Sequence, residues 1–251
     1  MERQLETVNI LGVDINCISR DELVKLALHW VGGAQQRTIM YANAHCLNTA
    51  IIDHPYRRIL GWADLVIADG VGVVWGSRFL GGCKLQKLVA GAWINKVCED
   101  SARMGVSIYI LAGKPGIATL ARDALTRNWS GLNIIGTCDG YFQTKSEETF
   151  MLEISETKPD LLFVGMGMPY QEKWLHEHRE QLPIPLCWVV GALFDYIAGT
   201  EERSPDVIDS MGLEWLWRLM LDPKGKWKRY IIGNPVFVYH LIKQKAGFTN
   251  Y

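Results

Sequence analysis

The sequence predicts an α/β protein: a Rossmann-like, mostly parallel sheet with helices on both faces, plus a C-terminal helical appendage. Short apolar runs rich in β-branched residues alternate with segments of helical periodicity over about the first 200 residues. These runs are continuously apolar, as in strands that are buried on both faces. From about Pro205 the chain becomes rich in Trp, Leu and basic residues. We therefore expect an α/β core over residues 1–204 and a helical appendage over residues 205–251.

The elements of the first half follow from local signals. Ser19 and Glu22 form a capping box ahead of apolar residues at helical spacing, and Gly105 is a natural C-terminal stop for a helix. Apolar runs followed by Asn43 and by Asp69-Gly70 indicate two buried strands. The expected elements are, in order, a helix after Ser19, a strand at 38–41, a helix from about 45, a strand at 65–68 and a helix at 91–104.

The second half continues the alternation and then changes character. Four further strands are expected at 106–111, 132–136, 161–164 and 186–190, and each ends in a glycine-containing turn. In the appendage, Asn234 is expected to cap a helix that begins at Pro235.

The most informative segment is the turn that follows the strand at 161–164. Gly165-Met166-Gly167 leads into a helix that opens near Tyr170 with Gln171, Glu172 and Lys173. A glycine turn between a buried strand and a helix N-terminus is where parallel α/β proteins bind phosphate-bearing ligands. The segment therefore predicts an enzyme with a polar, phosphate-bearing substrate, whereas a solvated helix surface is the alternative for Gln171 and Lys173.

Polar residues at the ends of the predicted strands are the candidates for chemistry. Because parallel strands end at one edge of the sheet, we expect Asn43, Asp69, Gly113, Gly165 and Asp195 along one rim. Asp69, beside Gly70, suits a general base, but it could instead cap the following helix. Asn43 and Asp195 could bind a sugar or a nucleobase, and each could also be a helix cap.

Charge and composition narrow the partners. The formal net charge is -1, so no global field favours nucleic acid. Basic residues gather near the C-terminus, and the candidates for a diphosphate are Arg218, Lys226, Lys228 and Arg229. A solvated or lipid-facing basic surface is the other interpretation of the same residues.

Several common motifs are absent from the sequence. The six cysteines show no CxxC pair or zinc-site spacing, which favours a reduced, intracellular protein. No signal-peptide core and no membrane-spanning apolar run is recognisable. The chain has no Asp-x-Asp pair, no P-loop and only part of a GxGxxG fingerprint, so we expect neither a metal nor a cofactor.

Taken together, six ordered motifs resemble the WecG/TagA/CpsF family of bacterial glycosyltransferases over roughly residues 10–230. They are Asn43-Ala44-His45, Ala68-Asp69-Gly70-Val71-Gly72, Asp139-Gly140-Tyr141-Phe142, Gly165-Met166-Gly167-Met168-Pro169-Tyr170-Gln171-Glu172, Val190-Gly191-Ala192-Leu193-Phe194-Asp195-Tyr196-Ile197-Ala198-Gly199 and Gly212-Leu213-Glu214-Trp215-Leu216-Trp217-Arg218.

The resemblance implies an inverting, metal-independent transfer of a sugar from a UDP-sugar donor. The implied acceptor is a polyprenyl-diphosphate-linked sugar in cell-surface polysaccharide synthesis, at the cytoplasmic face of the bacterial inner membrane, where the protein would be peripheral. By the same resemblance, the base falls on Asp69. The substrate-binding positions fall on Asn43, Gln171, Asp195, Arg218, Lys226 and Arg229. A homo-oligomer is left open.

Two positions differ from the family's usual pattern and leave the donor sugar open. Tyr41, which is also expected to bind substrate, stands where threonine is common, and Leu88 to Trp93 lacks two charges that are common there. Two other functions are kept as alternatives. One is a nucleotide-dependent oxidoreductase on a Rossmann-like fold, and the other is a non-catalytic nucleotide-sugar-binding protein.

Overall fold

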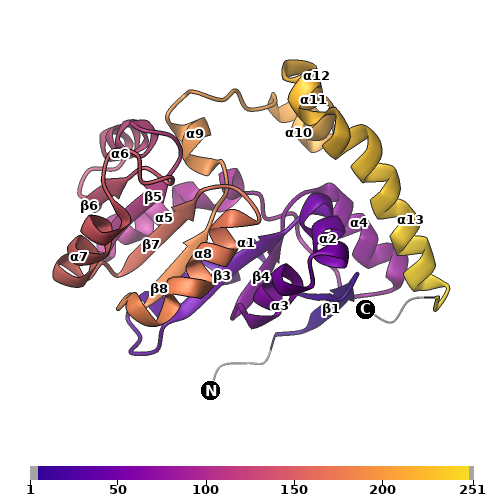
Figure 1. Ribbon diagram of the computed structural model, residues 1–251, viewed down its shortest axis with the longest axis horizontal. Helices are drawn as coiled ribbons and strands as arrows, with labels where there is room; N and C mark the ends of the chain where they lie inside the picture. The colour runs from indigo at the N-terminus through magenta and orange to yellow at the C-terminus, as the bar shows by residue number, and fades with distance from the viewer. Residues whose placement is uncertain (1–4, 249–251) are drawn as a thin grey trace.

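A computed structural model describes residues 5–248 and contains one six-stranded, all-parallel sheet in the order β4-β3-β8-β7-β5-β6 (Figure 1). The predicted fold class is confirmed. The first four residues of the predicted core and the last three of the predicted appendage lie outside the described residues. The strands of the sheet are β3 (Arg37–Ala42), β4 (Leu65–Ala68), β5 (Ser107–Ala112), β6 (Asn133–Cys138), β7 (Leu161–Gly165) and β8 (Leu186–Val189).

Helices cover both faces of this sheet. One face carries α1 (Arg20–Val31), α5 (Ala90–Met104), α6 (Ile117–Asn128) and α9 (Leu193–Ile197). The other carries α2 (Ala44–Ile52), α3 (His54–Trp62), α4 (Val71–Leu80), α7 (Glu147–Thr157) and α8 (Tyr170–His178), which is followed by the 3₁₀ turn η1 (Arg179–Gln181). Each face has its own apolar core, and on the first face Trp93 stacks on Trp188 with ring centroids 4.1 Å apart.

The topology opens a crevice at the carboxyl ends of β3 and β8. These two strands are neighbours, yet the chain leaves β3 towards α2 on one face and leaves β8 towards α9 on the other. Loops that leave on opposite faces separate from each other, and ligands of open α/β sheets bind at such a switch point.

A small hairpin at the N-terminus was not predicted. β1 (Thr7–Ile10) and β2 (Val13–Asn16) pair antiparallel around Leu11 and Gly12, which have φ of 53° and 81°. Both strands alternate buried and exposed residues, and glycine suits a hairpin turn that needs positive φ. The signal for a hairpin was therefore present in the sequence.

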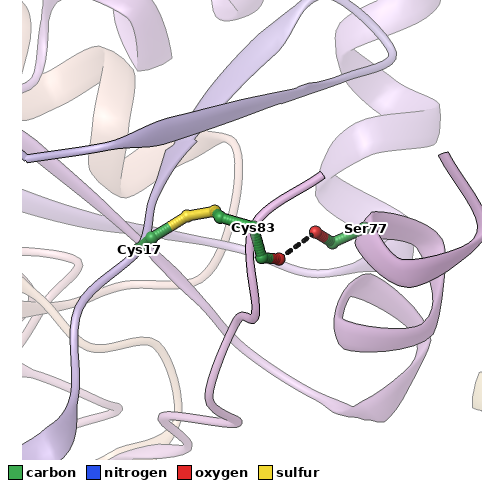
Figure 2. Close-up of a disulfide and its surroundings, with 3 residues drawn as sticks. All are labelled: Cys17, Ser77 and Cys83. Atoms are coloured by element: carbon green, nitrogen blue, oxygen red, sulfur yellow. Dashed lines mark hydrogen bonds between the residues drawn. A yellow bond between two sulfur atoms is a disulfide. The ribbon is translucent and has the colours of Figure 1, made fainter. Parts of the chain in front are cut away.

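The expectation of reduced cysteines is wrong for one pair. Cys17, just after β2, forms a disulfide with Cys83, just after α4, and Ser77 donates to the Cys83 carbonyl at 2.7 Å (Figure 2). The two cysteines are 66 positions apart, and the fold brings them together by packing β1 against α4 and β2 against β4. Sequence spacing carries no trace of that contact. Cys46, Cys98, Cys138 and Cys187 are free and buried.

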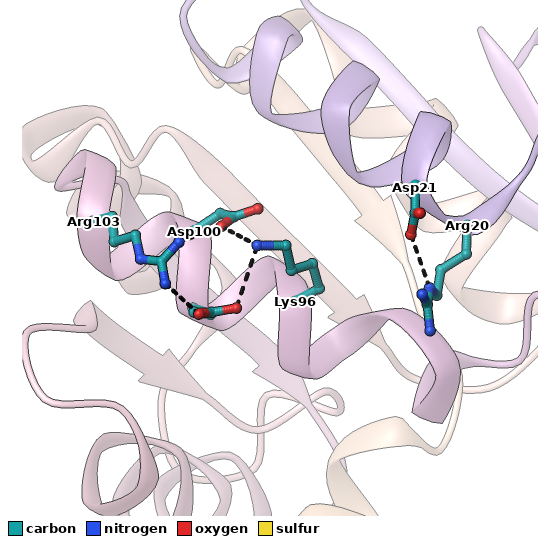
Figure 3. A network of polar contacts seen from close by, with 6 residues as sticks. Arg20, Asp21, Lys96, Asp100 and Arg103 are labelled. Carbon is teal, nitrogen blue, oxygen red and sulfur yellow. Dashed lines mark hydrogen bonds and ion pairs between the residues drawn. The ribbon is translucent and has the colours of Figure 1, made fainter.

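The exposed face of α5 carries a group of ion pairs. Lys96 pairs with Asp100 at 2.7 Å, and Arg103 pairs with Glu99, while Arg20 and Asp21 pair separately on α1 (Figure 3). Exposed pairs of this kind contribute little to stability. They mark the solvent side of α5, whose opposite side buries Trp93.

From Asp206 to Lys245 the chain is mainly helical and lies at one end of the molecule, opposite β6, α6 and α7 (Figure 1). Its elements are α10 (Asp206–Ser210), α11 (Glu214–Leu221), α12 (Pro223–Trp227), the π-helical turn η2 (Lys228–Ile232) and α13 (Gly233–Lys245).

The prediction that a helix begins at Pro235 is wrong. The backbone stays helical from Pro223 to Lys245 and passes Pro235 in the first turn of α13. The reason is the π turn: the Gly233 N–H donates to the Lys228 carbonyl, five residues back. A helix that widens in this way just before a proline tolerates its missing N–H donor.

Candidate functional site

A polar cavity of about 490 Å³ lies at the carboxyl ends of β3, β4 and β8. The sequence-predicted residues Tyr41, Asn43, Asp69, Arg218 and Arg229 all line it. They come from two strand ends and from the appendage, so the appendage forms one wall of the site. The segment from Lys87 to Trp93, Gly167, Gly191 and Arg203 are among the other lining residues.

The Asn43 side chain both caps α2 and orients Asp69. Its Oδ1 accepts from the backbone N–H groups of His45 and Cys46, both at 3.0 Å, and so caps α2. Its Nδ2 donates to Asp69 Oδ2 at 3.0 Å. Both roles considered for Asn43 are thus compatible, because the cap uses the oxygen and leaves the amide hydrogens free for the carboxylate.

Asp69 has the environment of a general base. It is half-buried, and Gly70 rather than Asp69 occupies the N-cap of α4, without a side-chain cap. Burial raises the pKa of Asp69, the Asn43 hydrogen bond opposes that rise, and nearby Glu214 adds to it. A carboxylate with raised pKa is a stronger proton acceptor than an exposed one.

Arg218 and Arg229 place positive charge beside Asp69. Arg218, on α11, pairs with Glu214 and lies over the Tyr196 ring at 5.2 Å, and Arg229 lies over the Tyr230 ring at 5.4 Å. Burial lowers the pKa of Arg218, but Glu214 raises it and the net direction is upward, so the guanidinium stays charged. The arrangement suits an anionic group such as a diphosphate.

Gln171 is fully buried and acts within the protein framework. Its Oε1 accepts from the backbone of Gly167 and Gly191, both at 3.2 Å, and of Met166 at 3.3 Å. Its Nε2 donates to the Tyr41 hydroxyl at 3.1 Å and to Glu172 at 2.9 Å. Gln171 therefore connects the turns after β7 and β8 to the end of β3. Among its hydrogen-bond partners, Tyr41 lines the cavity with its side chain, and Glu172 does not.

Gly113 and Gly165, which were expected to bind substrate, do not line the polar cavity. The Gly113 N–H donates to the Gly165 carbonyl at 2.9 Å. A Cβ on Gly165 would lie 2.6 Å from the Gly191 carbonyl oxygen, and one on Gly113 would lie 2.5 Å from Ile117. These glycines allow neighbouring turns to approach each other closely.

Comparison with known protein families identifies the family of this chain. The model of the glycosyl transferase WecG/TagA/CpsF family matches residues 8–251, which is nearly the whole chain. The chain belongs to the WecG/TagA/CpsF family of glycosyltransferases. The resemblance seen in the sequence motifs is confirmed, and so is the prediction of a glycosyltransferase.

Two relatives of the WecG/TagA/CpsF protein carry the same name, N-acetylglucosaminyldiphosphoundecaprenol N-acetyl-beta-D-mannosaminyltransferase. The one from Bacillus subtilis (strain 168) is 28% identical over 246 residues, covering 97% of this chain and 93% of its own. The one from Staphylococcus aureus (strain NCTC 8325 / PS 47) is 28% identical over 245 residues, covering 95% and 93%. Membership in this family decides against the oxidoreductase alternative.

Asp195 and Lys226 do not line the cavity of this family member, although Tyr196, next to Asp195, does. Asp195 is in α9, and burial raises its pKa, as does Glu201. Lys226 is 4.0 Å from Glu201. Lys173, which was expected near a ligand, instead pairs with Asp53 at 2.6 Å.

Three cationic or imidazole side chains that line the cavity were not predicted from the sequence. His45 and Lys87 line it beside Asp69, and Lys87 pairs with Asp209 of the appendage at 2.7 Å. Arg203 lies so close to Gly91 that a Cβ there would be 2.3 Å from its Nη1. Burial, and then Arg229, lowers the pKa of His45, which favours the neutral ring. His45 follows the Asn43 motif directly, whereas Lys87 and Arg203 carry no local signal.

No helix within residues 5–248 has the length and apolar character needed to cross a membrane. In the same part of the chain, one group of side chains has the spacing of metal ligands, formed by Glu6, Cys17 and Cys83. The disulfide between Cys17 and Cys83 leaves neither cysteine as a thiolate, so this group is not a metal site. None of the three lines the polar cavity.

Proposed function

We propose that this protein is an inverting, metal-independent glycosyltransferase that uses a UDP-sugar. The sugar moved is a hexose or N-acetylhexosamine, and the acceptor is a sugar on a polyprenyl diphosphate in cell-surface polysaccharide synthesis. The observation that carries the proposal is Asp69, a half-buried carboxylate oriented by Asn43 beside Arg218 and Arg229. The names of the relatives, which specify a sugar on diphosphoundecaprenol as acceptor, support the same acceptor class here.

In the proposed reaction, Asp69 takes the proton from the acceptor hydroxyl. The oxygen attacks C1 of the donor sugar, and the bond from C1 to the phosphate oxygen breaks with its electron pair leaving on UDP. Attack from the face opposite the leaving group inverts the configuration at C1. General-base catalysis of this kind contributes roughly 10²–10⁴-fold in rate.

The other site residues divide between two roles in this proposal. Tyr41 and Asn43 face the sugars directly, and Arg218 and Arg229 bind the acceptor diphosphate. Gly113, Gly165 and Gln171 shape the nucleotide side through the turns that they hold together. Asp195 and Lys226 lie outside the cavity wall and would reach a substrate only at its outer end, towards the nucleotide and the diphosphate respectively.

The proposed location is the cytoplasmic face of the bacterial inner membrane, with the protein peripheral. Apolar residues on α11 to α13, including Leu221, Trp227 and Ile231, are exposed next to basic residues such as Lys224 and Lys228. Such a surface suits adsorption to anionic lipids. It would present the cavity to an acceptor that is anchored in the same membrane.

The test is UDP release from a panel of UDP-sugars, with N-acetylglucosamine on a polyprenyl diphosphate as acceptor. The panel contains N-acetylmannosamine, N-acetylglucosamine and glucose donors. We expect acceptor-dependent release with one of these donors and an unchanged rate in EDTA, because side-chain cations can stabilise the diphosphate. Complete EDTA inhibition that Mg²⁺ or Mn²⁺ restores would refute the metal-independent mechanism. Binding of UDP-sugars without any transfer would favour the non-catalytic alternative.

A further inference from the structure

A second cavity, of about 590 Å³, continues from the polar one and runs between α4 and α13. The two cavities share Asn43, Asp69, Arg218 and Arg229 at their junction. A molecule that presents a hydroxyl to Asp69 from the polar cavity could therefore extend past the two arginines into the second. The volume lies in the range of about 300–1,000 Å³ typical of small-ligand sites.

The second cavity differs from the first in chemistry. Among its lining residues, every charged side chain also lines the polar cavity. Beyond the junction the wall is mainly apolar and contains, among others, Val71, Trp75, Leu213, Phe237, Val238 and Ile242. The charged side chains are thus confined to the junction of the two cavities, and the rest of the second cavity has an apolar wall.

Two glycines on α4 allow α13 to pack closely along this cavity. Gly72 and Gly76 line the cavity and face α13. A Cβ on Gly72 would lie 3.7 Å from a ring carbon of Phe237, which is ordinary van der Waals contact. A Cβ on Gly76 would lie only 3.3 Å from Leu241. Glycine weakens a helix interior relative to alanine, so its use here costs helix stability, and a larger side chain at either position would narrow the cavity along α13.

The cavity opens to the surface through exposed apolar side chains. Trp75 is 61% exposed, Val238 52% and Ile242 53%. These residues adjoin the exposed apolar surface of the appendage described above. An apolar chain leaving the cavity would therefore pass directly onto the surface that we assign to the membrane.

We propose that this cavity binds the isoprene units next to the diphosphate of the acceptor. The inference rests on the proposed function and adds a binding site for the lipid itself. The occupant follows from the order of chemistries along the two cavities: a base, then paired cations, then an apolar channel that opens at the surface. A polyprenyl-diphosphate sugar has the same order, namely hydroxyl, diphosphate and hydrocarbon. Burying each isoprene unit then adds affinity in proportion to apolar area.

The experiment measures transfer in solution, without membranes, to acceptors that carry one, two, three or four isoprene units. We expect the KM of the acceptor to fall at least about tenfold from one unit to three and then to level off as the cavity fills. A KM that does not depend on chain length would overturn the inference while leaving the proposed function intact. Absence of transfer to every acceptor would overturn both.

Matched variants locate the effect on α13. Val238→Glu places a charge at the cavity mouth, whereas Val236→Glu makes the same change two residues away, at a 37% exposed position outside the lining. We expect Val238→Glu to raise the KM of the longest acceptor about tenfold and to leave that of the shortest unchanged. Val236→Glu should change neither. Equal losses in the two variants would assign the effect to the helix surface and overturn the inference.

Gly72→Leu provides a second test that does not add charge. A Cβ there would already touch Phe237, so the larger side chain narrows the cavity, while it improves helix propensity. The melting temperature of the variant checks that the fold is retained. We expect the variant to lose the dependence of KM on chain length and to keep transfer to the shortest acceptor. Retention of the full chain-length dependence by a folded Gly72→Leu protein would contradict the cavity as the lipid site.

Discussion

Asn43 and Asp69 show how one hydrogen bond can connect folding with chemistry. The capping oxygen of Asn43 fixes the side chain at the start of α2, and its amide then holds Asp69 at 3.0 Å. The proposed base is therefore positioned by a residue that the helix needs in any case. Removing the carboxylate should affect the reaction far more than the fold.

We predict that Asp69→Asn lowers kcat by about 10²–10⁴-fold, the usual cost of losing a general base. The asparagine keeps the shape of the side chain and can still accept from Asn43, so UDP-sugar binding by calorimetry and the melting temperature should remain close to wild type. Asp21→Asn, at an exposed position on α1, is the matched control and should keep full activity. Near-normal turnover by a folded Asp69→Asn protein would remove Asp69 from the mechanism.

Glu172 is a buried carboxyl group directly beneath the site. It is 0% exposed, and its Oε2 has no hydrogen-bond partner among the described residues. Burial raises its pKa from 4.5 to about 7, against the opposing hydrogen bond from Gln171. A carboxyl group with raised pKa in the folded state stabilises the fold at low pH, and this contribution is lost as pH rises from about 4.5 through about 7.

We therefore predict that Glu172→Gln raises the free energy of unfolding at pH 8, by roughly 1–3 kcal/mol, because it avoids a buried charge and keeps the acceptor for Gln171. Near pH 4 the two proteins should have similar stability. Urea denaturation at both pH values measures the difference, with exposed Glu177→Gln on the same helix as control. A stability gain in Glu172→Gln that does not change with pH would contradict the titration of Glu172 as its cause.

The site residues that follow strands, and the two arginines of the appendage, could be predicted from the sequence, whereas residues on irregular segments could not. Asn43 and Asp69 end β3 and β4, so strand prediction alone placed them on the rim. Lys87 and Arg203 come from irregular segments, and only the folded chain brings them to the cavity. Gln171 was found for its position, but its burial depends on the turns that surround it.

Among the elements, α13 links the appendage to the core. Phe237 and Leu241 are buried against the face that carries α2 and α4. Gln244 accepts from the Leu11 N–H at 2.9 Å and donates to the Asn9 carbonyl at 3.0 Å, which fixes the β1–β2 hairpin. Removing residues after Asp209 would therefore expose core surface, and point substitutions are the better probe of this segment.

We predict that Phe237→Ala destabilises the protein by about 3–5 kcal/mol, the range for deleting a buried phenylalanine ring. Tyr239→Ala, two residues away and 57% exposed, should change the free energy of unfolding by less than about 0.5 kcal/mol. Chemical denaturation of both variants measures the contrast. A small effect of Phe237→Ala would mean that α13 is only loosely attached to the core.

The strands of the sheet were predictable because buried parallel strands are continuously apolar. The path of the appendage was less predictable. Gly233-Asn234-Pro235 has the composition of a helix boundary, yet the π turn η2 lets the helix continue through it. Tyr230 is buried beside Trp215 of α11, and Phe237 is buried against the core. No local window of sequence contains these tertiary contacts.

On the scale of the whole molecule, the distribution of charge and apolar surface is asymmetric. The net charge is -1, but Lys224 and Lys228 are exposed beside Trp227, which is itself 44% exposed. This surface lies at the end of the molecule away from α6 and α7 (Figure 1). A protein with such a distribution should adsorb to an anionic membrane in one orientation, with the appendage towards the lipid.

We predict that Lys224→Glu combined with Lys228→Glu lowers binding to vesicles containing anionic lipid at least about tenfold, since each basic residue near such a surface contributes about 1 kcal/mol. Arg127→Glu combined with Lys158→Glu makes the same change in net charge at the opposite end of the molecule, in α6 and just after α7. Co-sedimentation with vesicles at two salt concentrations compares the pairs. Because the two double variants have the same net charge, a difference in vesicle binding between them reports which end of the molecule faces the membrane. Equal losses in both pairs would mean that the protein responds to total charge, and the membrane-facing role of the appendage would then be wrong.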